Sequence, residues 1–313
     1  MSKQVRFTLR QLNYFVAAGD ALSIRQASLH INVSEPSISS AISQLESEFG
    51  ITLFIRHHAQ GLSLTQAGTE MLRDTKALLR QGHELEHTAE QLTEGVSGHF
   101  TVLSFTALAP FVIPSVCHKF QSLNPNVSLN IREANQADIL DQLWHGKADI
   151  AITYDLDLPA GLQFTPMTSL APYAVLARSH PLAKRKRISL EKLCTEPLVL
   201  LDLPLSREYF LSLFQSLNLS PTLLTTTRQI DVMRSIVGQG YGYGLANVRP
   251  GNKMTLDGNE LVYIPLEGNL SALTLGLLNH ASAARSKLAK LFVAHVHEQL
   301  EKGLLPGTTV STH

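Results

Sequence analysis

The hydrophobic positions of the first fifty residues recur at helical spacing and predict three short helices. The first helix covers residues 9–18, and we expect it to end at Gly19 and Asp20. Ser23 precedes the second helix and Ser34 the third, each in the position of an N-cap whose hydroxyl accepts a backbone N–H. Two short helices joined by a tight turn predict a helix-turn-helix.

The outward face of the third predicted helix is rich in small hydroxylated side chains. Ser37, Ser39, Ser40 and Ser43 lie on this face, and Gln44 follows them. Small side chains let a helix enter the major groove of DNA, and hydroxyls can bind phosphates or bases. A solvated helix surface has the same composition, so the pattern alone leaves both interpretations open.

Two segments of alternating apolar and polar residues follow the third helix. They cover residues 51–56 and 62–65 and flank a polar loop that contains Gly61. This pattern predicts a β-hairpin. A hairpin that directly follows a helix-turn-helix is typical of a wing, so residues 1–66 predict a winged helix-turn-helix.

Five motifs in this region resemble the LysR-type transcriptional regulators. They are LRQLNYF (9–15), SEPSIS (34–39), LESEFG (45–50), LFIR (53–56) and LTQAG (64–68), in the family's order and spacing. The resemblance continues to about residue 302 and implies that the third helix enters the major groove of double-stranded DNA. The candidate DNA-contacting residues are Arg25, Ser34, Glu35, Pro36, Ser37, Ser39, Ser40, Gln44 and Arg56.

Two of these residues depart from the family's pattern. Glutamine is usual at the position of Glu35, and a long basic side chain is common at that of Ser40. A glutamate can accept a hydrogen bond from cytosine, but it equally suits the positive N-terminus of its own helix. Both interpretations of Glu35 stay open. Residues 1–66 have a net charge of only +1, so we expect modest non-specific DNA affinity.

Residues 67–95 predict a long helix with a heptad pattern. Large residues recur every seven positions in one row, and small residues recur every seven in another. Such a helix needs a partner, and the resemblance implies a linker helix that makes a homodimer, with homotetramers usual in the family. Packing against its own domain is the alternative. The candidate dimerisation residues are Met71, Thr75, Leu78, Gly82, Leu85, Ala89 and Leu92.

The same helix contains an H-E-x-x-H sequence, the spacing of zinc hydrolases. It comprises His83, Glu84, Leu85, Glu86 and His87. The heptad places the leucine in the seam and both histidines on the outward side, and no third ligand follows. We therefore expect no catalytic site, no metal and no cofactor. A zinc hydrolase is the rival enzyme hypothesis.

Strands and helices alternate beyond residue 100 and predict an α/β fold with largely parallel sheets. Residues 111–123 are expected to form one helix, and residues 283–300 a last amphipathic helix. The resemblance implies a two-lobed effector domain, similar to periplasmic binding proteins, with chain crossovers near 165–169 and 266–270. The expected regions are 96–302 for this domain, with lobe I at 96–166 and 270–302 and lobe II at 167–269, and a tail at 303–313.

Ligands of open α/β sheets bind beyond the carboxyl ends of strands and at helix N-termini. The candidate effector-binding residues at such positions are Thr106, Ala107, Asn135, Gln136, Thr153, Tyr154, Asp202, Ser206, Arg207 and Asn247. Because arginine binds carboxylates bidentately, Arg207 favours a small carboxylate or polar effector. Pairing of Arg207 with Asp202 or Glu208 is the alternative interpretation.

Composition limits the remaining functions. The 313 residues contain 26 basic and 26 acidic side chains and two cysteines, which excludes a polycationic tail and a disulfide framework. We find no signal sequence and no membrane span, so we expect a cytoplasmic protein. Cys117 and Cys194 are expected to be structural thiols, with a peroxide-sensing pair as the alternative. A small-molecule binding protein that does not read DNA is the rival to a regulator.

Overall fold

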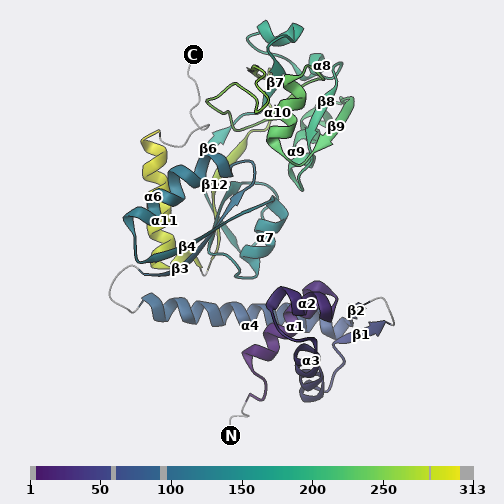
Figure 1. The fold of residues 1–313 in the computed structure, drawn as a ribbon, viewed down its shortest axis with the longest axis vertical. Coiled ribbons are helices and arrows are strands. Elements are labelled where there is room, and N and C mark those ends of the chain that lie inside the picture. The colour runs from purple at the N-terminus through teal and green to yellow at the C-terminus, as the bar shows by residue number, and fades with distance from the viewer. Residues whose placement is uncertain (1–4, 58–60, 92–96, 282, 304–313) are drawn as a thin grey trace. The chain divides into compact units, whose positions relative to one another are not determined.

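The computed structural model describes residues 5–57, 61–91, 97–281 and 283–303. The chain divides into two compact units, Met1–Ala89 and Glu90–His313, and each is described by itself (Figure 1). Among the described residues, no helix has both the length and the apolar character needed to cross a membrane.

Three short helices build the N-terminal unit and confirm the predicted helix-turn-helix: α1 (Leu9–Ala21), α2 (Ile24–Ile31) and α3 (Glu35–Phe49). The two predicted N-caps are in place. The Ser23 hydroxyl accepts the backbone N–H of Gln26, and the Ser34 hydroxyl accepts that of Ser37. The helices enclose an apolar core that includes Leu12, Phe15, Ala27, Ile38, Ile42 and Leu45.

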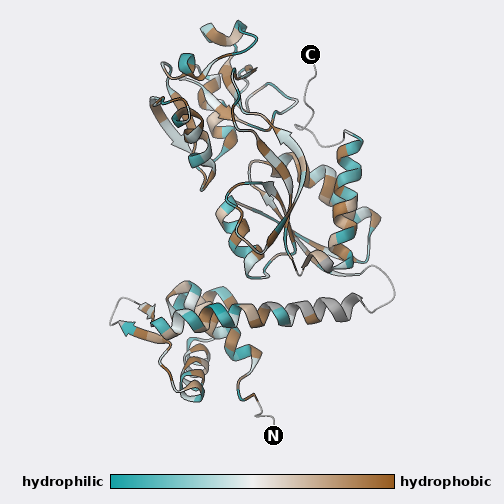
Figure 2. Cartoon of the chain, turned by 180° about the vertical axis from the view of Figure 1, so that it is seen from behind, coloured by the Kyte–Doolittle hydropathy of each residue, from teal (hydrophilic) through white to brown (hydrophobic). Residues whose placement is uncertain are grey.

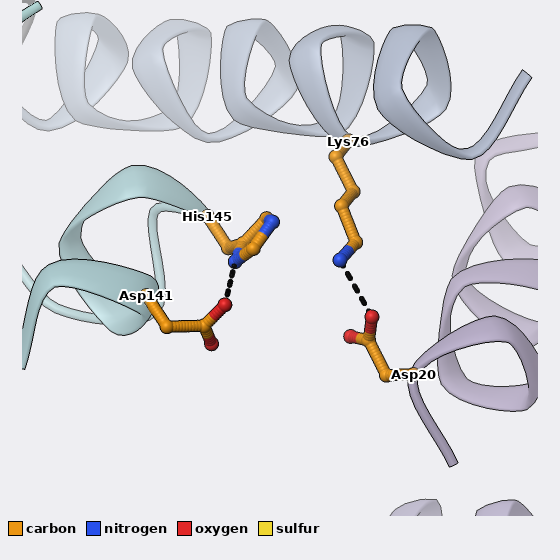
Figure 3. A network of polar contacts seen from close by, with 4 residues as sticks. All are labelled: Asp20, Lys76, Asp141 and His145. Carbon is orange, nitrogen blue, oxygen red and sulfur yellow. Dashed lines mark hydrogen bonds and ion pairs between the residues drawn. The ribbon is translucent and has the colours of Figure 1, made fainter. Parts of the chain in front are cut away.

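Helix α1 continues through Gly19 and Asp20, so the prediction that it ends there is wrong. A glycine inside a helix costs about 1 kcal/mol relative to alanine. The following residue makes a tertiary contact, in which the Asp20 carboxylate pairs with Lys76 of α4 (Gln66–Gln91) at 2.5 Å (Figure 3). The helix ends where Leu22 adopts a left-handed conformation.

The predicted wing is a two-stranded antiparallel hairpin of β1 (Phe54–His57) and β2 (Gly61–Leu64). Its entry is fixed by a carboxylate from α3. Glu46 accepts the backbone N–H of Leu53 at 2.7 Å and that of Phe54 at 3.3 Å. The side chain of Glu46 thereby joins α3 to the start of the hairpin.

Gly68, in the first turn of α4, holds this helix against the residue that precedes the wing. A Cβ at Gly68 would lie 2.0 Å from the carbonyl oxygen of Leu53. The backbone N–H of Gly68 also donates to the Thr65 hydroxyl at 2.8 Å. Only glycine allows this close approach, so α4 begins in a defined place against the winged domain.

Lobe I of the C-terminal unit contains a five-stranded sheet in the order β4-β3-β5-β12-β6. Its strands are β3 (Gly98–Phe105), β4 (Val127–Ala134), β5 (Ile150–Tyr154), β6 (Leu162–Leu170) and β12 (Leu273–His280). Strand β3 is parallel to β4 and β5, but β12 is antiparallel to both β5 and β6. The expectation of a largely parallel sheet is therefore wrong for the part of the sheet that contains β12 and β6.

Helices cover both faces of this sheet (Figure 1): α7 (Gln136–Trp144) on one, and α5 (Ala109–Val112), η1 (Ile113–Cys117), α6 (His118–Leu123) and α11 (Lys287–Glu301) on the other. Helix α11 carries both hydrophobic and hydrophilic stretches (Figure 2), as expected of an amphipathic helix. Its Phe292 packs against Phe100 of the sheet and Phe120 of α6.

The single helix predicted over 111–123 is interrupted by the π-helical segment η1. Pro114 lies in this segment and has no backbone N–H to donate to the preceding turn. The helix widens locally and resumes at His118.

Lobe II contains an antiparallel sheet in the order β10-β7-β11 and a parallel pair, β8 with β9. Its strands are β7 (Tyr173–Ala177), β8 (Leu198–Leu201), β9 (Leu223–Thr227), β10 (Gly244–Ala246) and β11 (Leu261–Pro265). Its helices are η2 (Pro181–Lys184), α8 (Leu190–Leu193), α9 (Ser206–Gln215) and α10 (Ile230–Gly238). The glycine-rich segment 238–244 is a turn from α10 into β10, in which Gly242 has a φ of 143° against the carbonyl of Pro197.

The chain passes between the lobes twice. Strand β6 pairs with β12 up to Leu170, so the first crossover lies at 171–172 and not inside the expected segment 165–169. The second crossover connects β11 to β12 through residues 266–272, where it was expected. Strand β12 follows β6 by more than a hundred residues in the sequence, and its pairing with β6 extends lobe I beyond the predicted boundary.

We predict that Gly68→Ala destabilises the N-terminal unit by about 2 kcal/mol, because the new methyl group overlaps the Leu53 carbonyl. Gly82→Ala is the matched control on the same helix, since its Cβ would meet only Leu9, at an ordinary 3.8 Å. The control is expected to be neutral or slightly stabilising. Thermal unfolding followed by circular dichroism measures both, and equal melting temperatures for the two variants would contradict the prediction.

Candidate functional site

The N-terminal turn of α3 is exposed to solvent. It presents the predicted DNA-contacting residues Ser34, Glu35, Pro36, Ser37 and Ser40. The hydroxyls of Ser34 and Ser37 lie 2.8 Å apart and form a hydrogen bond. Ser39 is only half-exposed, because it lies beside the face of the helix that packs into the core. Small polar side chains and the N-terminus of the 15-residue helix α3 are therefore available to a phosphate or a base edge.

The other three predicted contacts lie on different elements. Arg25 on α2 and Arg56 on β1 are exposed, and neither takes part in an ion pair among the described residues. Gln44 is exposed on α3, but its amide oxygen accepts a hydrogen bond from the Gln11 amide of α1 at 2.7 Å. Gln44 is thus oriented by α1, which leaves its amide nitrogen free of described protein contacts.

Three of the four acidic side chains within residues 1–66 make contacts inside the N-terminal unit. Asp20 pairs with Lys76, Glu48 pairs with Arg6 at 3.5 Å, and Glu46 binds backbone N–H groups of the wing entry. Glu35 alone of the four acidic residues within 1–66 has no described ion pair or hydrogen bond, and it is exposed at the first turn of α3. Of these four carboxylates, Glu35 is therefore the one left to repel phosphate without a described partner.

The C-terminal unit contains a cavity of about 210 Å³ between its two lobes. Lobe I contributes the last residues of β3 and β5 and residues of the segment after β3, and lobe II contributes residues of α9, α10 and the antiparallel sheet. The wall is predominantly apolar and includes six aromatic rings: Phe105, Phe111, Tyr154, Tyr173, Phe210 and Tyr263. A cavity with a predominantly apolar wall suits a ligand with an apolar body and few polar groups.

Three polar side chains in the cavity wall are among those predicted for effector binding. Tyr154 from lobe I and Ser206 and Asn247 from lobe II are all buried. The hydroxyls of Tyr154 and Ser206 make no hydrogen bond among the described residues. Burial holds the pKa of Tyr154 well above its usual value, so its hydroxyl is a neutral donor at physiological pH.

Ala107 is the fourth predicted effector residue that lines the cavity. The remaining six, Thr106, Asn135, Gln136, Thr153, Asp202 and Arg207, are not part of its wall. Several of these serve the fold. Asn135 caps α7, and Gln136 accepts from the Thr153 hydroxyl while donating to the carbonyls of Tyr154 and Leu156. The buried amide thereby positions the backbone that carries Tyr154.

The structure supports the alternative interpretation of Arg207, in which it pairs with Asp202. Its Nη1 atom lies 3.2 Å from each carboxylate oxygen of Asp202, one turn before α9. The pair closes the loop at the start of α9, where Leu205 has a φ of 66° and no side chain caps the helix. A carboxylate ligand is therefore not needed to neutralise Arg207.

Arg234 is the cationic residue of the cavity, and the prediction from sequence missed it. It lies on α10, whose buried residues are Met233 and Val237. Met233 immediately precedes Arg234 and Val237 follows it by three positions, so the arginine borders the apolar stripe of a short amphipathic helix. That position is the signal that could have identified it, because a cation beside an apolar stripe needs a partner.

A chain of hydrogen bonds joins the cavity to both crossovers. The Asn247 amide donates to the carbonyl of Leu170, at the end of β6, and to the Tyr209 hydroxyl, both at 2.9 Å. The Tyr209 hydroxyl in turn donates to the carbonyl of Ser271 at 2.8 Å, in the second crossover. Asn247 also lines the cavity, so one side chain contacts the ligand space and the connection between the lobes.

The long helix α4 uses its predicted dimerisation residues in two ways. Thr75 is buried and Met71 is packed against the N-terminal core, which is the own-domain alternative. By contrast, Leu78 is 38% exposed and Leu85 is 70% exposed. The side chain of Ala89 and all of Leu92 lie outside the described residues.

The side chains of the H-E-x-x-H sequence, His83, Glu84, Glu86 and His87, also lie outside what the structure describes. In the described part of the chain, no group of three metal-ligating residues comes together. Cys117 is buried in lobe I, where desolvation raises the pKa of its thiol to about 12. Cys194 lies in lobe II and donates to the carbonyl of Ser220. Burial of Cys117 therefore disfavours the reactive thiolate form of this thiol.

Comparison with protein families finds two matching models. Residues 9–69 match the bacterial regulatory helix-turn-helix protein, lysR family, and residues 93–301 match the LysR substrate binding domain. The YnfL transcriptional regulator of Escherichia coli strain K12 is 26% identical over 293 residues, which cover 92% of this chain and 97% of YnfL.

Two solved structures from Pseudomonas aeruginosa are also similar. The PA01 protein is 35% identical, with 95% of this chain and 100% of that chain covered at a TM-score of 0.64. HinK, a LysR family transcriptional regulator, is 35% identical, with 94% of this chain and 99% of that chain covered at a TM-score of 0.63.

We predict that Tyr209→Phe lowers the free energy of unfolding of the C-terminal unit by about 1–2 kcal/mol, because Asn247 and Ser271 both lose a partner. Tyr243→Phe is the matched control, since the Tyr243 hydroxyl is buried without a hydrogen-bond partner. Its removal should be neutral or stabilising. Urea unfolding followed by circular dichroism compares the two variants. A larger loss for Tyr243→Phe would refute the assignment.

Proposed function

The chain belongs to the LysR family of transcriptional regulators, and we propose that a small molecule bound between its lobes controls how it engages DNA. Its two family domains are those of a DNA-binding regulator with a ligand-responsive domain, and regulators of this family act as oligomers.

The observation that carries the proposal is the cavity itself, whose wall is built from both lobes. A ligand that touches both lobes binds most tightly in the arrangement that completes its contacts. It therefore shifts the population toward that arrangement by its difference in affinity for the two states. A surface pocket on one lobe would have no such effect.

Asn247 and Tyr209 provide a route from the cavity to the crossovers. A ligand acceptor that takes the Asn247 amide N–H competes with the hydrogen bonds that hold Leu170 and, through Tyr209, Ser271. A ligand donor that binds the Asn247 amide oxygen reinforces them. Because these two carbonyls lie where the chain passes between lobes, a change at the cavity alters the restraint on lobe movement. Asn247 and Tyr209 thereby position the connections between the lobes when a ligand binds.

DNA reading is assigned to the exposed N-terminal turn of α3, with Arg25 and Arg56 as phosphate contacts. Small serines allow close approach to the groove, and Arg56 on the wing supplies charge that the helix lacks. Glu35 acts against phosphate binding and favours a register in which it faces a base. Double-stranded DNA in the cytoplasm is the corresponding partner and location.

The exposed part of α4 is assigned to oligomer formation. Leu78 and Leu85 lie seven residues apart and are both exposed in the single chain. A heptad of exposed leucines is stabilised when a second copy of the helix covers it. A homodimer through α4 is the smallest assembly that this surface supports.

Binding of the full-length chain to its own upstream intergenic DNA tests the function, with scrambled duplex as control, across a salt series. We expect nanomolar binding to the upstream fragment, at least about a thousandfold tighter than to scrambled DNA. Equal and weak binding to both, lost at physiological salt, would instead support a small-molecule binding protein that does not read sequence.

We predict opposite effects from two charge changes on the DNA-reading surface. Arg56→Ala removes a phosphate contact, so it should weaken binding to all duplexes and reduce the slope of log affinity against log salt by about 1. Glu35→Gln removes a repulsive charge and should tighten binding to scrambled duplex several-fold. Fluorescence anisotropy at several salt concentrations measures both. Unchanged affinity in both variants would exclude this surface as the contact.

We predict that Leu85→Lys weakens self-association, because it places a charge in the proposed seam. Leu256→Lys is the matched control, since Leu256 is 86% exposed in lobe II and lies outside α4. Sedimentation velocity at several protein concentrations should show a lower mass for Leu85→Lys alone. The same mass for Leu85→Lys and the unmodified chain would show that α4 is not the interface.

A further inference from the structure

Arg234 is half-buried and lines the cavity, and only part of its guanidinium group is hydrogen-bonded. Its Nη2 atom donates to the carbonyls of Asn252 and Met254, both at 3.2 Å, and to the Tyr263 hydroxyl at 2.9 Å. All three acceptors are neutral. Its Nε atom is buried and has no hydrogen-bond partner. Among the described residues, no carboxylate forms an ion pair with Arg234.

A second guanidinium lies against the same ring. Arg249 lies 5.6 Å from the centre of the Tyr263 ring and Arg234 lies 5.9 Å from it. Arg249 makes no described ion pair either. Asp231, one turn before Arg234, also lines the cavity, but it is exposed to solvent and outside ion-pair distance of the arginine. Two half-buried guanidinium groups therefore lie against the Tyr263 ring without a described ion pair, and Arg234 is the one of them that lines the cavity.

We infer that the effector is a small monoanion with one aromatic ring, whose carboxylate is bound by Arg234 and whose ring lies among the aromatic side chains of the cavity. This inference rests on the proposed function, and it names the ligand class of the same cavity. A carboxylate supplies the counterion and the missing acceptor together, through charge-assisted hydrogen bonds.

The size and lining of the cavity support a one-ring body. A cavity of about 150 Å³ lined by apolar side chains accommodates benzene, and this one is about 210 Å³. Phe105 and Tyr154 of lobe I pack edge to face at 5.4 Å, which leaves a surface of rings against which another ring can pack. Chains or sugars rich in hydroxyls would leave most of their polar groups without partners there.

The test compares ligands that share a shape and differ in charge. Benzoate, benzamide and benzylamine are titrated into the full-length chain by isothermal calorimetry, with acetate as the ringless anion. Benzoate should bind at least tenfold more tightly than each of the other three. Equal or tighter binding of benzamide or benzylamine, or no detectable benzoate binding, would overturn the inference.

Two variants separate the role of Arg234 from effects on folding. Arg234→Gln should weaken benzoate binding at least tenfold and leave benzamide binding nearly unchanged, because only the anion loses its counterion. Arg178→Gln is the control, since Arg178 is exposed on lobe II and outside the cavity wall. It should bind both ligands as the unmodified chain does.

Arg207→Gln tests the residue that the sequence favoured as the carboxylate site. Loss of benzoate binding in this variant, with Arg234→Gln unaffected, would overturn the inference. DNA binding of each variant without ligand is measured in parallel. Specific DNA binding without benzoate binding would reject the ligand class alone, whereas benzoate binding without specific DNA binding would reject the proposed function alone.

Discussion

Asn247 and Tyr209 hold the two places where the chain passes from one lobe to the other. One amide nitrogen binds both the Leu170 carbonyl and the tyrosine hydroxyl, and that hydroxyl binds the Ser271 carbonyl. The Leu170 carbonyl ends β6, and the Ser271 carbonyl lies in the connection from β11 to β12. Because buried polar groups are costly to leave unpaired, the lobes have a preferred arrangement that a ligand at Asn247 can strengthen or oppose.

The apolar wall of the cavity gives its few polar groups large effects. In a low-dielectric site, a guanidinium with only neutral acceptors and a hydroxyl without a partner both favour a complementary ligand more strongly than they would in water. Arg207 shows the contrasting case in the same lobe, since Asp202 already neutralises it. Arg234, which has no described ion-pair partner, thereby differs from an arginine that serves a structural ion pair.

The N-terminal unit solves a different electrostatic problem. It approaches a polyanion with little net positive charge, but its acidic side chains largely serve internal contacts: Asp20 holds α1 to α4, and Glu46 holds α3 to the wing. The exposed cations Arg25 and Arg56 are left outside any described ion pair. The placement of these exposed cations therefore compensates for the small net charge of the unit. Glu35 is the exception, because it is an exposed carboxylate at the N-terminal turn of α3 without a described partner.

Much of the fold was predictable from the sequence because its signals are local. The caps at Ser23 and Ser34, the left-handed ends of α2 and α3, the hairpin and the turn at 238–244 each depend on residues within a few positions of one another. The family motifs likewise identified the helix-turn-helix and the two-lobed domain. Four of the ten proposed effector residues could be placed at the cavity because they follow strands or begin helices.

The sequence by itself determined the local elements, their order and the family, whereas the tertiary structure decided which side chains share the cavity. Helix α1 runs through Gly19, which lies against Leu72 of α4, and β6 extends past its expected end because β12 pairs with it. Arg207 and Arg234 look alike along the chain, but only folding shows that the first has a carboxylate nearby and the second does not. Such differences arise from residues far apart in sequence, which no local pattern records.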